Sequence, residues 1–399
     1  MCIKLRLVTA AVAVTSFLPF HSLAENGQIR LENGIDLTPT LTLGYWNDDN
    51  IIRSERNRFD SGLARVGVGL LSELKAGRTE YQLHYQGDWG SFQDSSIDNY
   101  DDHRIDFGFN TVVSEANELA FNVHFLRGHE SRGEGLSQGT VAETLSEPVE
   151  YENKGFKVDW TYHFLVERVW LEALSQYSDT EYKNTPILSD GRDRDELTTQ
   201  ASIYWQAGTG SSFFIQGRHT LIDYDDDFLG DLSRDGDDYR LLVGVRWQRG
   251  DLGYGTIGVG YQNKKFDEDR RENFNGFSWE IGLAWNPLDR LGFELESSRA
   301  SVEPPLDGDY IRQISHALSM DYEFSERLSL SSHIDYLDQN YVGFEREEER
   351  TSYGVSLVYA FQTNILLSLI AEREDNDSSL DDFSYEQNLI GLEVTLGLK

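Results

Sequence analysis

Large apolar residues alternate with small or polar residues in one short segment after another from Ile35 onward. In residues 353–361, every second residue is tyrosine, valine, leucine or phenylalanine, and the residues between them are mostly small. Residues 239–247 and 277–285 follow the same period of two. Successive side chains of a β-strand point to opposite faces, so each segment has one apolar face and one face of smaller or polar residues. The pattern therefore predicts an all-β chain.

The alternation resolves into about eighteen candidate strands, or sixteen if two weak segments belong to loops. They cover residues 35–46, 63–74, 78–88, 103–113, 118–127, 154–165, 168–178, 197–207, 212–222, 239–249, 254–264, 276–286, 290–299, 312–324, 327–337, 350–361, 364–373 and 384–398. An even number of strands lets one antiparallel sheet close into a barrel with both ends on the same rim. Closure also removes the unpaired edges that an open sheet of this size would expose.

The connections separate a membrane barrel from a soluble β-sandwich, because alternation occurs in both. Short connections lie at residues 75–78, 114–117, 166–168, 286–290, 325–327 and 362–364. Longer, acidic ones lie between them, at residues 223–238, 265–275 and 374–382. Tight turns on one rim and long loops on the other are typical of outer-membrane barrels. We therefore expect short periplasmic turns and long acidic extracellular loops.

Aromatic residues gather at the ends of the segments, among them Tyr45, Trp46, Trp205 and Trp285. The interface between membrane and water favours such amphipathic rings. The chain has no linker and no change of composition that would mark a second domain. We predict one domain, residues 25–399, that forms a single closed antiparallel transmembrane β-barrel in the outer membrane.

The N-terminus has the layout of a cleaved signal peptide, which we assign to residues 1–24. Two basic residues precede an apolar run over residues 7–20, and small residues precede the cleavage site after Ala24. The apolar run is too short to span a bilayer comfortably. Cys2, the only cysteine, lies in this segment, so the mature chain is predicted to lack disulfides and cysteine-based metal sites.

The net charge of −34 narrows the range of partners. A surface this acidic argues against nucleic acid, whose phosphates require a basic surface. The aromatic content of 12% is above that of disordered acidic chains. We expect contact with outer-membrane lipid and lipopolysaccharide. The oligomeric state stays open, because a subunit interface and a lipid-facing surface use the same apolar residues.

The faces opposite the apolar ones would line the lumen and supply the candidate functional residues. The basic candidates are Arg65, Lys157, Arg218, Arg240 and Arg246, and the acidic candidates are Asp106, Asp159, Glu172, Glu280, Glu294, Glu296, Asp335, Glu372 and Glu393. Rings of charge set pore selectivity, so the neighbouring arginines would attract an anionic solute. Alternatively, opposite charges form inter-strand ladders that stabilise a wet wall. The mixed lining favours a broad, weakly selective channel, with room left by small inward residues such as Gly244 and Gly354.

The connection 128–153 would either fold inward and narrow the pore or lie outside as a solvated loop, and we favour the outside position. The Gly-x-Ser-x-Gly match at residues 135–139 lies within this long connection and not between a predicted strand and a helix, as a nucleophile elbow would require, and no His-Glu-x-x-His element occurs. The histidines His84, His124, His163 and His333 can face the lumen, but a serine or aspartate neighbour for them has little diagnostic value. We expect no enzymatic activity, no cofactor and no bound metal.

The first strand and loop carry a family resemblance. Residues 37–45 read Leu-Thr-Pro-Thr-Leu-Thr-Leu-Gly-Tyr and are followed by Asp-Asp-Asn-Ile-Ile-Arg at 48–53. A tyrosine-containing strand at 81–85, Gly-Asp at 87–88 and Tyr-Asp-Asp-His at 100–103 come next. These residues resemble the outer-membrane β-barrel porins often encoded within exopolysaccharide and capsule biosynthesis loci, most clearly over about the first 110 residues.

The resemblance implies a barrel that takes part in the export of an extracellular polysaccharide, with the polysaccharide and periplasmic export components as partners. A passive diffusion porin for small solutes is one alternative function. A structural barrel, whose acidic loops bind partners while its lumen is closed, is another.

Overall fold

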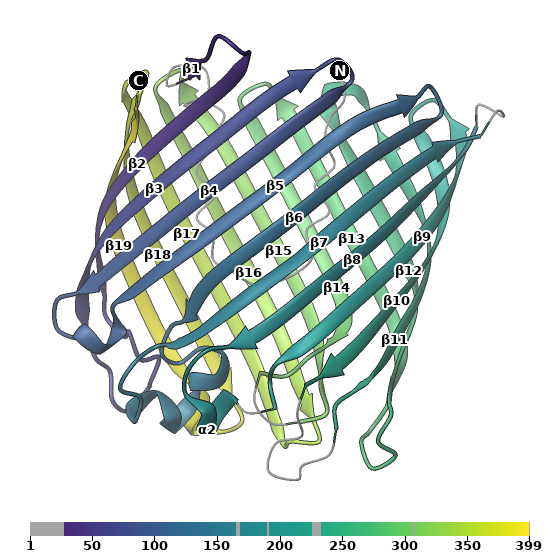
Figure 1. Cartoon of the computed structure of the whole chain (residues 1–399). Helices are drawn as coiled ribbons and strands as arrows, with labels where there is room; N and C mark the ends of the chain where they lie inside the picture. Colours follow the sequence, from purple (N-terminus) through teal and green to yellow (C-terminus); the bar gives the residue numbers. More distant parts are fainter. Residues whose placement is uncertain (1–27, 165–167, 190, 226–232, 306–307, 399) are drawn as a thin grey trace.

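The computed structural model describes residues 28–164, 168–189, 191–225, 233–305 and 308–398, which form a closed β-barrel (Figure 1). Eighteen long antiparallel strands, β2 to β19, pair in chain order, and β19 pairs with β2 to close the wall. A short extra strand, β1 (Ile29–Arg30), pairs with the start of β2. The fold confirms the predicted all-β class and the count of eighteen.

The strands that form the wall are long enough to extend beyond the apolar part of a membrane. Their bounds are β2 Ile35–Asp48, β3 Ser61–Ala76, β4 Thr79–Phe92, β5 Tyr100–Ser114, β6 Asn117–Glu130, β7 Val149–His163, β8 Val169–Tyr182, β9 Arg194–Gly208, β10 Ser211–Tyr224, β11 Gly236–Gln248, β12 Gly253–Phe266, β13 Phe274–Leu288, β14 Leu291–Val302, β15 Tyr310–Ser325, β16 Leu328–Val342, β17 Arg346–Gln362, β18 Ile365–Ser378 and β19 Tyr385–Gly397.

The connections alternate in length around the barrel. Most turns on one rim, such as 77–78 and 363–364, have two residues, and we call this the short-turn rim. The opposite rim, which we call the long-loop rim, carries longer connections such as 49–60 and 131–148, although the β16–β17 connection has only three residues. The helix α2 (Pro186–Ser189) lies on the long-loop rim, at the bottom of Figure 1.

The strand ends differ from the predicted bounds in a systematic way. At the short-turn rim they agree within two residues, whereas at the long-loop rim every strand except β19 extends two to five residues further than predicted. Residues 374–378, for example, belong to β18 and not to the predicted acidic loop. In this zone polar residues occupy both faces of many strands, so the regular alternation disappears while the backbone ladder continues.

The two faces of the wall differ as the alternation requires. Large apolar side chains such as Leu241 (56% exposed) and Leu392 (64% exposed) point outward. Trp205 and Trp285 are also exposed, as expected for rings at a membrane interface. Trp46 is not: it is 6% exposed and donates a hydrogen bond from Nε1 to Glu393. The prediction of an interface position was therefore wrong for Trp46. Successive residues of a strand point to opposite faces, and the preceding residue, Tyr45, points outward.

Two observations concern the N-terminal segment and the helices. The predicted signal peptide, residues 1–24, lies outside the described residues. Among the residues that the structure describes, no helix has the length and apolar character needed to cross a membrane.

Candidate functional site

The charged residues predicted to line the lumen all lie on the inward face of their strands. The assignment follows from strand parity: Arg240, for example, lies between the exposed residues Tyr239 and Leu241. The same parity places the remaining basic and acidic candidates inward. Inward placement is the first requirement for contact with a solute, although Arg240 and Glu393 are buried within the wall, and the part of these residues in conduction stays a prediction.

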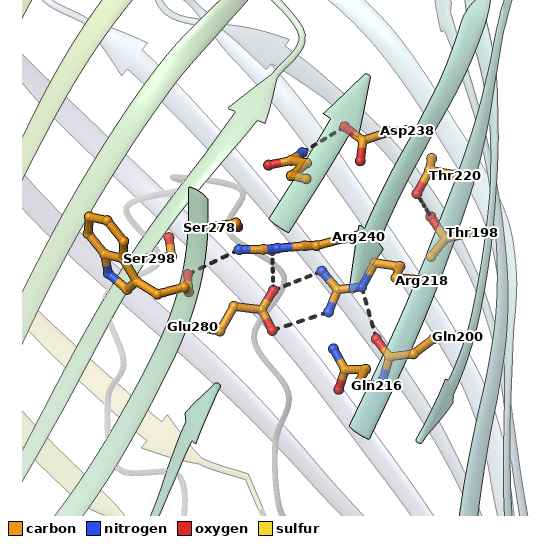
Figure 2. A network of polar contacts seen from close by, with 12 residues as sticks. Thr198, Gln200, Gln216, Arg218, Thr220, Asp238, Arg240, Ser278, Glu280 and Ser298 are labelled. Atoms are coloured by element: carbon orange, nitrogen blue, oxygen red, sulfur yellow. Dashed lines mark hydrogen bonds and ion pairs between the residues drawn. The ribbon is translucent and has the colours of Figure 1, made fainter. Parts of the chain in front are cut away.

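Two of the predicted arginines share one carboxylate. Arg218 on β10 donates hydrogen bonds of 2.8 and 3.3 Å to the two oxygens of Glu280 on β13, and Arg240 on β11 also pairs with Glu280 (Figure 2). Arg218 Nε donates to Gln200 at 2.9 Å, and Arg240 donates to the backbone carbonyl of Trp279 at 3.0 Å. These arginines are therefore held in place by the wall, as the ladder interpretation predicts.

The third predicted arginine is held in an aromatic setting. Arg246 donates to the two oxygens of Glu172 at 2.7 and 3.2 Å, and its guanidinium lies 4.2 Å from the centre of the Tyr204 ring. Trp170 stacks on this tyrosine with ring centres 4.9 Å apart. Phe214 packs beside Tyr204 in the same buried cluster. Sequence reasoning overlooked these inward aromatic residues, although the same period of two places them.

On another part of the wall, carboxylates outnumber their basic partner. Arg65 on β3 pairs with Asp88 on β4 and lies 3.2 Å from Glu393 on β19. Tyr100 donates a hydrogen bond of 3.2 Å to the same aspartate. One guanidinium thus serves two carboxylates, and the cluster keeps a net negative charge.

Several carboxylates on the wall from β14 to β18 have no basic partner among the residues that the structure describes. Glu296 on β14 and Asp335 on β16 both pair in register with Ala317 on β15. Asp335 lies 3.8 Å from His333, but within the described ranges no ion pair with lysine or arginine is found for Glu294, Glu296 or Glu372. Among the predicted lumen residues, these acids therefore carry most of the negative charge that has no basic partner.

The remaining predicted residues lie on the wall from β5 to β7. Lys157 and Asp159 on β7 pair with each other at 3.2 Å. Asp106 on β5 pairs with Arg104 at 2.6 Å. These short-range pairs leave little net charge at their own positions.

The connection 131–148 does not lie outside, as we favoured from the sequence, but packs over the mouth at the long-loop rim. Arg346, inward on β17, donates a hydrogen bond of 2.8 Å to Gln138 in this connection. Leu136, Ser137 and Ala142 are completely buried. Arg132 anchors the connection to Asp98 of the β4–β5 loop at 2.6 Å. Each of these contacts involves a side chain in a loop, so strand periodicity could not have revealed them.

A second arginine holds the same connection from the β2–β3 loop. Arg53 lies 2.8 Å from Glu134 and 3.6 Å from Glu374 on β18. Burial lowers the pKa of this guanidinium, but the neighbouring Glu134, Tyr385 and Glu374 raise it by more, so the net pKa is raised. Arg53 therefore stays charged and ties the connection to the inner wall.

The inward glycines leave less room for solute than we expected. A Cβ atom at Gly244 would lie 2.5 Å from the Phe214 ring, and one at Gly354 would lie 2.3 Å from the His333 ring. The space beside these glycines is thus occupied by side chains of the wall.

The inward histidines contact ordinary polar and aromatic neighbours. His124 shares a hydrogen bond of 2.8 Å with Asn153, and the ring of His163 lies beside that of Trp170. Within the described part of the chain, no group of three or more histidine, cysteine, aspartate or glutamate residues has an arrangement that could hold a metal ion.

Comparison with known protein families gives a match for this chain. Residues 36–398 match the family described as "Putative beta-barrel porin 2". No curated protein matches the chain.

Several solved structures align with most of this chain at low identity. OccK5 (OpdH) of Pseudomonas aeruginosa is 14% identical, with a TM-score of 0.48 and coverage of 91% of this chain and 98% of its own. OpdL of the same organism is 11% identical, with a TM-score of 0.47 and coverage of 92% and 99%. The FrpB iron transporter of Neisseria meningitidis (F5-1 variant) is 10% identical, with a TM-score of 0.49 and coverage of 90% and 81%.

Proposed function

Because the chain belongs to this family of β-barrel porins, we propose that it forms an outer-membrane channel for hydrophilic solutes and prefers cations to anions. The closed barrel with an apolar outer face and a polar inner face supports insertion in the outer membrane. The proposal involves no catalytic step.

The uncompensated acids of the lumen carry the preference for cations. Glu172 neutralises Arg246, and Glu280 offsets one of the two positive charges of Arg218 and Arg240, so little free positive charge is left for an anionic solute. Glu294, Glu296 and Asp335, in contrast, face the lumen with at most a histidine nearby. Fixed charge of one sign in a narrow lumen raises the local concentration of the opposite ion.

The orientation of the barrel follows from its two rims. We propose that the short-turn rim faces the periplasm and the acidic long-loop rim the outside, as in other outer-membrane barrels. Export through the cleaved signal peptide at residues 1–24 is part of the same proposal. Lipopolysaccharide would then surround the outer half of the wall.

Export of an extracellular polysaccharide, with periplasmic export components as partners, is a second candidate function. It is favoured by the family resemblance of residues 37–103. The inner wall also carries amide side chains that line a pocket, such as Asn110 and Asn122, which suit sugar hydroxyls. The acidic lumen favours a neutral or cationic polymer over an anionic one.

Ion selectivity in a planar bilayer tests the main proposal. We expect folded protein to form stable channels whose reversal potential in a KCl gradient has the sign of a cation-selective pore. The Glu294→Gln/Glu296→Gln variant should shift the reversal potential toward zero. Glu347→Gln, which removes an outward carboxylate on β17, should not. Absence of conductance from folded protein, or selectivity for anions, would contradict the proposal.

The same channels distinguish the second candidate. A neutral polysaccharide added to the short-turn side should interrupt the current if the lumen admits a polymer. Current that is unaffected by neutral and cationic polysaccharides would leave only small solutes as cargo.

A further inference from the structure

A pocket of about 480 Å³ lies on the inner wall formed by β2 to β7, close to the short-turn rim. Inward carboxylates and amides line it, including Asp36, Glu73, Glu80, Gln82, Asn110 and Asn122. Its volume falls within the range of small-molecule sites, about 300–1,000 Å³. None of these six residues was among the charged positions that we selected from the sequence.

Two carboxylates of the pocket face each other across one strand pair. Asp36 on β2 is the register partner of Glu73 on β3. Like charges directly opposite each other on one face of a sheet are destabilising. The repulsion between Asp36 and Glu73 therefore destabilises the barrel when the pocket is empty. A cation bound between the two carboxylates would remove this repulsion.

The other charges of the pocket do not relieve this pair. Glu80 is held by Lys75 at 2.8 Å, and Asp159 is held by Lys157 at 3.2 Å. The basic group nearest to Asp36 is Arg30, at 3.7 Å with 74% of its side chain exposed, where an ion pair contributes little. The oxygen of Asp36 that faces Arg30, Oδ1, is buried and has no hydrogen-bond partner among the described residues. The pocket thus retains two carboxylates that a cation could neutralise.

The amide side chains of the pocket can form hydrogen bonds to a ligand. Gln82 donates a hydrogen bond of 2.8 Å to Glu73, which orients that carboxylate. Asn110 and Asn122 line the same pocket from β5 and β6. An amide offers both donors and acceptors, so it suits hydroxyl groups, which are donors and acceptors as well.

We propose that this pocket binds an amino-sugar unit. Its ammonium group would lie between Asp36 and Glu73, and its hydroxyls would bond to the amides of Asn110 and Asn122. The inference deepens the proposed channel function, on which it rests, by naming a solute class and a place on the wall where that solute pauses.

Calorimetric titration of the folded barrel in detergent tests the site without requiring conduction. The probe is the glucosamine trimer, and its fully N-acetylated form serves as the uncharged match. We expect the amino form to bind, and the Asp36→Asn/Glu73→Gln variant to lose at least tenfold in affinity. The control Glu115→Gln/Glu118→Gln removes two negative charges at the same rim outside the pocket and should bind as the unmodified protein does.

Thermal unfolding without ligand checks that the variant folds. Asp36→Asn/Glu73→Gln should melt at a higher temperature than the unmodified protein, because the like-charge repulsion is gone. Equal binding of the acetylated trimer, unchanged affinity in the pocket variant, or no binding of the amino form would each overturn the inference. A barrel that conducts without binding refutes only the pocket, and one that binds without conducting refutes only the channel.

Discussion

At the scale of single residues, buried arginines in this barrel are anchored by carboxylates. The side chain of Arg240 is only 6% exposed and pairs with Glu280, and Arg346, 2% exposed, pairs with Glu348 at 2.7 Å. Removing a charge from water is costly, and only a close partner compensates the loss. Such pairs fix the geometry of the lumen more than they offer free charge to a solute.

Arg132 allows a direct test of this anchoring. In Arg132→Ala, Asp98 would remain buried without its partner, and breaking a buried pair costs about 3–5 kcal/mol. We expect the connection 131–148 to detach from the mouth, with faster proteolysis within it and a larger single-channel conductance. Arg270→Ala, which removes an exposed arginine paired with its neighbour Glu268, is the control and should change neither. Unaltered protease resistance in Arg132→Ala would show that the anchor is unimportant.

At the scale of the strand, the wall has two zones. Across the apolar band, exposed apolar residues alternate with inward polar ones, whereas near the long-loop rim the outward face also carries ion pairs. Lys154 on β7, for example, points outward and pairs with Glu181 on β8 at 2.7 Å. The apolar band therefore marks the part of each strand that contacts lipid tails.

Adjacent positions on β15 test which face meets lipid. Leu318 is 43% exposed and points outward, and the next residue, Ser319, points inward opposite Glu294. A lysine at a lipid-facing position near the membrane midplane costs about 2–4 kcal/mol. Leu318→Lys should therefore lower the free energy of unfolding in vesicles by about that amount. Ser319→Lys should leave it nearly unchanged, since its ammonium can pair with Glu294. Equal losses would contradict the assignment of faces.

At the scale of the whole molecule, the barrel depends on one seam between distant parts of the chain. β19 pairs with β2 along nine register positions, from Leu389–Asp48 to Gly397–Thr40. At this seam Trp46 covers Gly391, where a Cβ atom would lie 2.3 Å from the indole ring. The tryptophan and the glycine thus fit together only when the barrel is closed.

Gly391→Leu should weaken this closure by forcing Trp46 out of place. Overpacking of a filled site costs about 1–3 kcal/mol, which we expect to appear as a lower urea midpoint for the folded, heat-modifiable form. Gly282→Leu is the matched control: it is also an inward glycine, on β13, but a Cβ atom there meets nothing within 4 Å. A similar decrease of the urea midpoint in both variants would contradict the prediction that closure depends on the fit of Trp46 against Gly391.

The sequence by itself determined the strands and their faces. A period of two is a local property of the backbone, so it located all eighteen strands and placed residues such as Arg218, Glu280 and Glu296 on the inward side. The same period of two also predicts an inward position for Trp170, Tyr204 and the two facing carboxylates of the pocket, although we did not select these residues from the sequence. At the long-loop rim the pattern became uninformative, because polar residues occupy both faces.

Only the tertiary structure decided which of these residues meet. Arg218 and Glu280 are 62 positions apart on strands that are not neighbours, so their contact depends on the curvature of the closed wall. The position of the connection 131–148 depends likewise on side chains from other loops, including Asp98 and Arg53. Strand periodicity specifies a direction for each side chain, but distances across a lumen arise only after the sheet has closed.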